Sequence, residues 1–140
     1  QLIQALLRDA ELSADDVRFV VGHGNAAIKS DRSELEYMKR VFGPRTAQVP
    51  LISVKPVYGH LMGASSALSV AAAAMMVHHQ FVVPTLNVDE ARVTPGFNHQ
   101  ANRGKADPCG AGVVVNYGLG GQNTALLLRG TGTDAQGVRA

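Results

Sequence analysis

Two histidines and a lysine stand at positions where a side chain can take part in chemistry. His23 and His60 each follow shortly after an apolar run, and Lys55 comes five residues before His60. A neutral imidazole donates a hydrogen bond to a developing oxyanion, and it also exchanges a proton near neutral pH. Loop histidines and lysines are also common as surface or structural residues, so spacing in the sequence does not establish that these three meet.

The elements around these residues predict an α/β arrangement. The runs 17–21 and 49–54 are rich in β-branched and apolar residues, and each is soon followed by glycine or proline. This pattern is typical of buried strands that end in loops. Because α/β proteins commonly place chemistry in loops at the ends of strands, His23, Lys55 and His60 are candidate site residues.

The remaining periodicity predicts three helices and three further strands. We expect a helix over 2–10, a second capped by Ser30 or Asp31 and ending near Phe42, and a third over 63–79. The third is apolar nearly all round, which is typical of a helix buried between layers or in a subunit interface. Strands are expected at 81–83, 111–116 and 123–128, the last two as an antiparallel pair.

Length and composition limit the function classes. The 140 residues suffice for one domain, which we expect over 1–129, followed by a disordered tail over 130–140. The net charge of +2 comes from scattered residues without a basic run, which argues against nucleic acid as a partner. The single cysteine, Cys109, excludes an internal disulfide and suits the cytoplasm. No apolar stretch is long enough to predict a membrane span.

Two further patterns predict no bound metal or nucleotide. His78 and His79 are adjacent, so on a helix they point in different directions and do not form a metal site. The loop 118–121 is rich in glycine but lacks the Lys-Ser/Thr sequel of a phosphate-binding loop. We therefore expect no cofactor and no metal.

Four motifs in order along the chain resemble those of the β-ketoacyl synthases. They are His23-Gly24 with Asp31 and Glu34, Ser53-x-Lys55-x-x-x-Gly59-His60-x-x-Gly63-Ala64, Pro84-Thr85-x-Asn87, and Asn116-Tyr117-Gly118-Leu119-Gly120-Gly121-Gln122-Asn123. The resemblance is to the fatty-acid and type II polyketide enzymes of this family. It implies the C-terminal half of a thiolase-like α/β/α/β/α fold, with a mixed sheet covered by helices.

The resemblance also implies roles for individual residues. His23 and His60 would promote decarboxylation of a malonyl thioester on acyl carrier protein, and the resulting carbanion would attack an enzyme-bound acyl group. Lys55 would order the site, and Glu34 and Asp31 would be supporting carboxylates. The family's nucleophilic cysteine motif is absent from this sequence. The resemblance therefore implies a separate N-terminal half that supplies the cysteine, with the complete unit forming a homodimer or heterodimer.

Some residues depart from the family pattern. Asn25, Ala26 and Ala27 stand where threonines are usual, at positions (Asn25 and Ala27) that would line the pantetheine channel. Leu119, between Gly118 and Gly120, replaces the phenylalanine of a loop that would gate the acyl pocket and supply an oxyanion hole. These changes favour an alternative, a non-catalytic subunit that shapes a partner's acyl pocket as chain-length factors do.

Retention of both histidines and the lysine favours the enzyme over that alternative. A third interpretation, a thiolase or a synthase primed by coenzyme A, fits less well, because the spacing of Asp31, Glu34 and Lys55 matches the elongating enzymes better.

Overall fold

The structure, a computed structural model, describes residues 1–131; most of the predicted tail over 130–140 lies outside the described residues. The helices are α1 (Leu2–Asp9), α2 (Ile28–Phe42), α3 (Lys55–Tyr58) and α4 (Gly63–His79), with single 3-10 turns η1 (Ala14–Asp16), η2 (Gly43–Ala47) and η3 (Glu90–Arg92). The strands are β1 (Phe19–Val21), β2 (Leu51–Ile52), β3 (Phe81–Val82), β4 (Lys105–Ala106), β5 (Ala111–Tyr117) and β6 (Asn123–Arg129).

A mixed sheet with the strand order β2-β1-β5-β6 forms the centre of the fold. β1 runs parallel to both β2 and β5, so Val20 lies opposite Leu51 on one side and Val113 on the other. β6 runs antiparallel to β5, which confirms the predicted hairpin. β3 and β4 pair separately as a small antiparallel sheet. The parallel pairs bring the ends of β1 and β2, and thus the two candidate loops, to the same edge.

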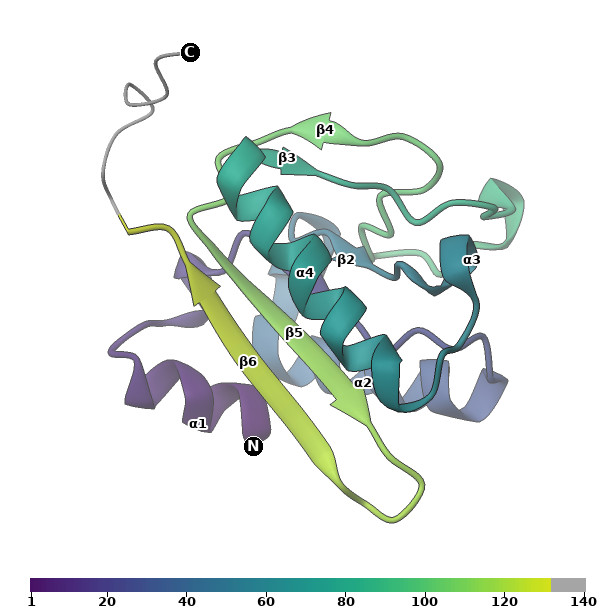
Figure 1. Cartoon of the computed structure of the whole chain (residues 1–140), viewed down its shortest axis with the longest axis horizontal. Coiled ribbons are helices and arrows are strands. Elements are labelled where there is room, and N and C mark those ends of the chain that lie inside the picture. Colours follow the sequence, from purple (N-terminus) through teal and green to yellow (C-terminus); the bar gives the residue numbers. More distant parts are fainter. Residues whose placement is uncertain (132–140) are drawn as a thin grey trace.

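Helices cover both faces of this sheet (Figure 1). Side chains alternate along a strand, so Val20 and Val113 pack in one core with α1 and α2, while Phe19 and Val114 pack in a second core with α4. The ring of Phe19 lies so close over Gly112 that a Cβ there would come within 2.0 Å of it. The fold is therefore three packed layers, which confirms the predicted mixed sheet covered by helices.

The start of α2 differs from the prediction. The helix begins at Ile28, after Ala27 at the N-cap position, with no side-chain cap. Ser30 and Asp31 therefore lie inside the helix, and the prediction that one of them caps it is wrong. The acidic side chain of α2 that bonds backbone is Glu34, which accepts the amides of His23 and Gly24 in the preceding loop instead of capping the helix.

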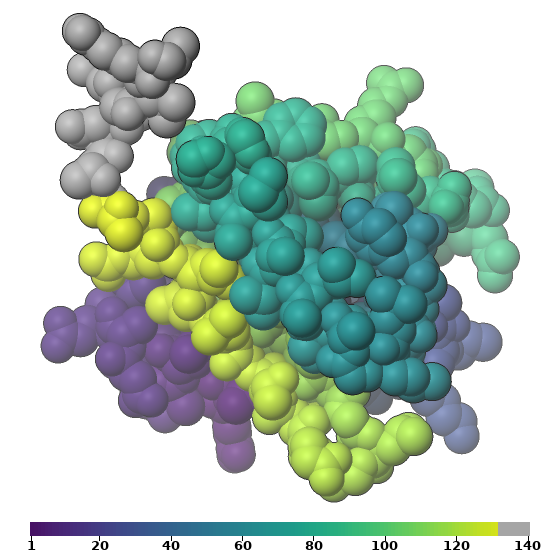
Figure 2. Space-filling model, in the orientation of Figure 1, coloured from purple at the N-terminus to yellow at the C-terminus, as the bar shows by residue number. Residues whose placement is uncertain are grey.

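The long helix α4 has two different faces, although its sequence is apolar nearly all round. Every third or fourth residue packs against the sheet, and this buried set is Ser65, Ser69, Ala73 and Met76. On the opposite side the exposed set is Ala64, Ala67, Ala71, Ala74 and Met75. The atoms of α4 lie across the front of the molecule in Figure 2. Within residues 1–131, no helix combines the length and the apolar character needed to cross a membrane.

Candidate active site

The structure brings the two histidines together. His23 lies directly after β1 and His60 in the loop between α3 and α4, and their ring centroids are 5.5 Å apart with the planes at 78°. His23 is buried, with 6% of its surface exposed, whereas His60 is exposed. The pair therefore forms a site with one wall inside the fold and one side open.

Glu34 and Lys55 hold the backbone of His23 from opposite ends. The N–H of His23 donates to Glu34 Oε1 at 2.7 Å, and the N–H of Gly24 donates to Glu34 Oε2 at 3.0 Å. The Lys55 ammonium, in the first turn of α3, donates to the carbonyl oxygen of His23. Both charged side chains are buried. Their hydrogen bonds go to the main chain of the His23 loop, so they position that loop.

Backbone amides contribute to which nitrogen of each imidazole carries the proton. The N–H of Tyr117 donates to Nδ1 of His23 at 3.3 Å, and the N–H of Met62 donates to Nδ1 of His60 at 3.1 Å. A nitrogen that accepts a hydrogen bond has no proton of its own. In the neutral state both rings therefore carry the proton on Nε2, which makes each Nε2 a hydrogen-bond donor.

Burial and nearby charge favour the neutral form of His23. Its pKa is lowered, first by burial and then by the positive charges of Lys55 and His60, against a hydrogen bond with the Asn116 side chain that acts the other way. Burial is also the main cause of the lowered pKa of Lys55 and of the raised pKa of Glu34. The site is thus poorly solvated, a setting in which a hydrogen-bond donor interacts strongly with a developing negative charge.

The end of β2 is braced against the His23 loop. Ser53 Oγ donates to the carbonyl oxygen of Gly24 at 3.0 Å, and a Cβ at Gly24, whose φ is +40°, would come within 2.7 Å of Ser53 Cβ. Thr85 Oγ1 accepts the N–H of Ser53, and the Asn87 side chain donates to the carbonyl oxygen of Pro56. The Pro84-Thr85-x-Asn87 motif therefore supports the segment that carries Lys55.

The two loops that depart from the family pattern lie near the histidines. Asn25 Oδ1 accepts the N–H of Ala27, and Ala26 between them has a φ of +63°, unusual for a residue with a Cβ. In the other loop, Tyr117 packs against His23 with ring centroids 5.6 Å apart, whereas the side chain of Leu119 is fully exposed. Gly118 bonds Gln122 through its backbone, which closes the turn.

Cys109 has the environment of a structural residue. Its side chain is fully buried in the core beneath α4, where Sγ donates to the carbonyl oxygen of Asp107. Burial raises the pKa of the thiol to about 11, so almost none is thiolate at neutral pH. Cys109 is therefore not a candidate nucleophile. Within residues 1–131 no group of three or more His, Cys, Asp and Glu side chains is arranged to hold a metal ion.

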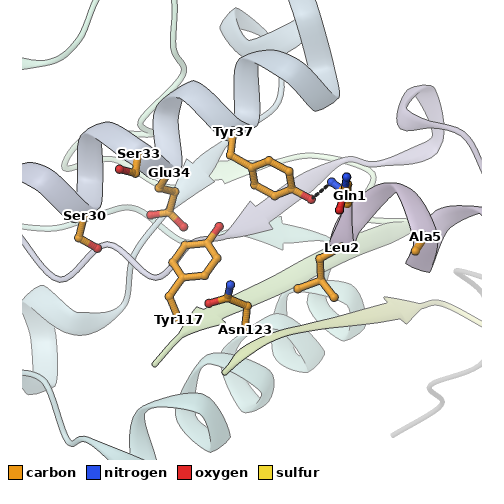
Figure 3. Close-up of a pocket in the computed structure, with 9 residues that line it drawn as sticks. All are labelled: Gln1, Leu2, Ala5, Ser30, Ser33, Glu34, Tyr37, Tyr117 and Asn123. Atoms are coloured by element: carbon orange, nitrogen blue, oxygen red, sulfur yellow. Dashed lines mark hydrogen bonds between the residues drawn. The ribbon is translucent and has the colours of Figure 1, made fainter. Parts of the chain in front are cut away.

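A cavity of about 770 Å³ is lined by Glu34 and Tyr117, two residues that also contact the His23 loop (Figure 3). It opens between α1, α2 and the β5–β6 hairpin, and Glu34 and Tyr117 line it with their side chains pointing toward one another. Burial raises the pKa of Tyr117. Among the residues that line the cavity, Glu34 and Tyr117 are the two that also form hydrogen bonds with His23.

Three contributors to the site were not predicted from the sequence. Tyr117 donates its amide to His23, Ser53 bonds Gly24, and Ser65 Oγ lies 3.0 Å from His60 Nδ1. Ser53 and Tyr117 lie within two of the four motifs, and in the sequence nothing else indicates that they contact the His23 loop. Ser65 replaces no motif residue, and its proximity to His60 results from the turn between them.

Comparison with known proteins identifies the family. Residues 1–89 match the family described as "Beta-ketoacyl synthase, C-terminal domain". Because this match covers more than half of the chain, the chain belongs to that family, as its motifs predicted.

Two curated relatives are similar over most of the chain. Nodulation protein E of Rhizobium leguminosarum bv. trifolii is 32% identical over 91% of this chain and 31% of its own length. The tetracenomycin polyketide synthase ketoacyl synthase alpha subunit of Streptomyces glaucescens is 32% identical over 92% of this chain and 30% of its own length. The chain thus spans about a third of the length of these relatives.

Solved structures confirm the fold. The ishigamide ketosynthase/chain length factor matches with a TM-score of 0.83 and 28% identity, over 91% of this chain and 31% of that one. AntDE:AntF, a type II polyketide synthase acyl carrier protein in complex with its ketosynthase, matches with a TM-score of 0.85 and 26% identity, over the same shares. The chain therefore has the thiolase-like fold of the C-terminal part of a ketosynthase.

Proposed function

We propose that this chain is the C-terminal part of a ketosynthase that joins a malonyl thioester, on acyl carrier protein, to an enzyme-bound acyl group. In this reaction the malonyl group loses carbon dioxide, and the electron pair of the broken bond forms an enolate. The enolate carbon then attacks the acyl thioester on a cysteine of the N-terminal half, and the cysteine thiolate leaves. We place this chemistry in the cytoplasm.

The observation that carries the proposal is the His23–His60 pair, with both Nδ1 atoms engaged by backbone amides. Two Nε2–H donors on adjacent rings can share one oxygen, the thioester oxygen that becomes negatively charged as carbon dioxide leaves. The lowered pKa of His23 supports this role. A neutral imidazole stabilises the oxygen by donating a hydrogen bond and does not transfer its proton to it. The buried Glu34 and Lys55 support it by fixing the His23 backbone.

An apolar surface next to the histidines supports a partner half that carries the cysteine. It consists of exposed side chains on α3, on the loop that follows it and on the adjoining glycine-rich loop: Val57, Tyr58, Leu61, Met62 and Leu119. Met62 alone is 76% exposed, and the apolar outer face of α4 continues the surface. Exposed apolar side chains in this number beside a site are typical of a protein interface. The complete unit would form a homodimer or heterodimer.

A second candidate function is a chain-length-factor-like subunit without catalysis. The changed loop at Asn25 and Ala27 and the exposed Leu119 favour it, and a ketosynthase/chain length factor is among the similar structures. The intact site around His23 and Lys55 favours the enzyme, because a subunit that only shapes a pocket has no chemical need for it.

Replacing His60 tests the proposal. In the chain assembled with its cysteine-bearing half, His60→Ala should lower release of carbon dioxide from malonyl carrier protein by about 100-fold, because an oxyanion donor is lost. Acylation of the cysteine should persist, since His60 does not act in that step. Both rates are measured separately, one by trapped carbon dioxide and the other by intact-protein mass.

An exposed histidine on the same chain provides the control. His79 lies at the far end of α4, beside the outer stripe of Ala67, Ala71 and Ala74 and not on it, so His79→Ala should leave both rates unchanged. Decarboxylation that survives His60→Ala would contradict the role proposed for His60. A wild-type assembly without decarboxylation would favour the chain-length-factor interpretation instead.

A further inference from the structure

Ser65 contacts His60 from within α4. Its Oγ lies 3.0 Å from His60 Nδ1 and accepts the N–H of Leu61 at 2.9 Å. The residue is on the buried face of the helix, with 5% of its surface exposed. The hydroxyl therefore sits between the end of the α3–α4 loop and the imidazole that the loop carries.

The direction of these hydrogen bonds follows from what each group can do. The Leu61 N–H can only donate, so it occupies a lone pair of Ser65 Oγ and leaves the hydroxyl hydrogen free to point at Nδ1. The Met62 N–H also donates to Nδ1, at 3.1 Å. Since both neighbours of Nδ1 then act as donors, the ring proton is on Nε2.

We propose that Ser65 is a positioning residue for His60, whose hydroxyl holds the ring in place and keeps the proton on Nε2. The inference rests on the proposed function, in which Nε2–H donates to the thioester oxygen. A hydroxyl in the first turn of a helix commonly bonds nearby backbone, and this explains the contact with Leu61. It does not explain the contact with the imidazole.

The loop itself shows why such an anchor is useful. Gly59 and Met62, on either side of His60 and Leu61, both have positive φ values, 76° and 51°. Glycine adopts this conformation readily, but methionine does so only when its surroundings hold it there. Ser65 accepts from Leu61 and contacts His60, so one side chain holds the two residues between these turns.

The test compares Ser65→Ala with Ser65→Thr in the assembled protein. Nitrogen-15 chemical shifts of the His60 ring, at a pH where it is neutral, report which nitrogen carries the proton. Ser65→Ala should shift the ring toward a mixture of tautomers and lower kcat for malonyl decarboxylation by about tenfold, equivalent to one net hydrogen bond. KM should stay within about twofold. Ser65→Thr, which keeps the hydroxyl, should retain the wild-type tautomer.

Ser69 provides a matched control one turn further along the same buried face. Its hydroxyl is buried and has no hydrogen-bond partner among the described residues. Ser69→Ala should therefore leave the His60 shifts and kcat unchanged. An unchanged tautomer in Ser65→Ala, or an equal loss of kcat in Ser69→Ala, would overturn the inference. A tautomer shift in a protein that releases no carbon dioxide would support the Ser65 contact and overturn only the proposed function.

Discussion

His23 is held by its main chain rather than by its ring alone. Glu34 lies on the buried stripe of α2 together with Met38 and Phe42, yet its carboxylate receives the amides of His23 and Gly24. On the other side of the same residue the Lys55 ammonium donates to the His23 carbonyl oxygen. Burying two charged groups costs free energy, and here each is compensated by hydrogen bonds to main chain whose own groups need partners.

The charge of Lys55 gives a prediction for the protonation of His23. The pKa of His23 is below its usual 6.5, and Lys55 is the second cause after burial. Lys55→Met removes a positive neighbour, so the pKa of His23 should rise toward 6.5. An NMR pH titration of the His23 ring, assigned with a His23→Gln variant, measures the change.

The same shift has a consequence for stability. Because the folded-state pKa of His23 is lowered, the unfolded chain binds this proton more readily. The contribution of neutral His23 to the free energy of unfolding is therefore complete above pH 6.5 and is lost as the pH falls through the folded-state pKa.

Lys105 is the matched control for the titration. It is an exposed lysine on β4, in the small sheet that does not carry His23, and it pairs with Asp107. Lys105→Met should leave the His23 titration as in the wild type. If Lys55→Met lowers the pKa of His23 or does not change it, the arrangement of charges described here is wrong.

The sequence predicted the identity of the site residues better than their contacts. The motifs named His23, Lys55 and His60, and the structure brings them together. The resemblance to a family implied that Glu34 supports the site, but not that it binds the amide of His23. The contact between Ser65 and His60 depends on the turn at Met62, where a residue with a Cβ adopts positive φ, and no local preference predicts that conformation.

At the scale of elements, α4 has a function on each face. Its inner face packs on the sheet through Ala73 and Met76 and carries Ser65 toward His60. The atoms of α4 are exposed at the front of the molecule (Figure 2), and the outer face carries the apolar residues Ala67, Ala71 and Met75. Small side chains such as Ala67 and Ala71 allow another helix to approach closely, so this face suits the cysteine-bearing half that we propose.

A charge on the outer face of α4 should prevent that assembly. Ala71 is exposed in the middle of the helix, so Ala71→Glu should leave the chain folded but would bury a charge in the interface. We expect the dissociation constant for the partner half to rise by at least about tenfold. Light scattering and circular dichroism of the variant measure assembly and folding separately.

The control for this variant is Arg40→Glu, an exposed position on α2, which packs on the opposite face of the sheet. It should leave assembly unchanged. Unimpaired assembly of Ala71→Glu would show that the outer face of α4 is not the interface.

Strands and helices were predicted better than their ends. The runs that became β1, β5 and β6 were apparent from β-branched and apolar residues, whereas β2 is shorter than its apolar run because Ser53 and Lys55 turn toward the His23 loop. The start of α2 was placed too late, because Ser30 and Asp31 resemble capping residues but lie inside the helix, and Glu34 bonds the loop before it.

At the scale of the whole molecule, the chain is a three-layer unit with the candidate site at one edge of its sheet (Figure 1). His23 is buried within it, and His60 is open toward the apolar surface formed by α3, the adjoining loops and the outer face of α4. The sequence lacks the nucleophilic cysteine motif, and Cys109 is a buried core residue, which is why we propose a partner half.

The central claim is that this site supports condensation once the cysteine is supplied. The most direct measurement incubates the assembled protein with an acyl donor and malonyl carrier protein, and determines the mass of the carrier-bound product. We expect an acyl chain extended by one acetate unit with a keto group, and release of one carbon dioxide for each extension. An acylated cysteine with no extended product, and carbon dioxide released only at the background rate, would contradict it.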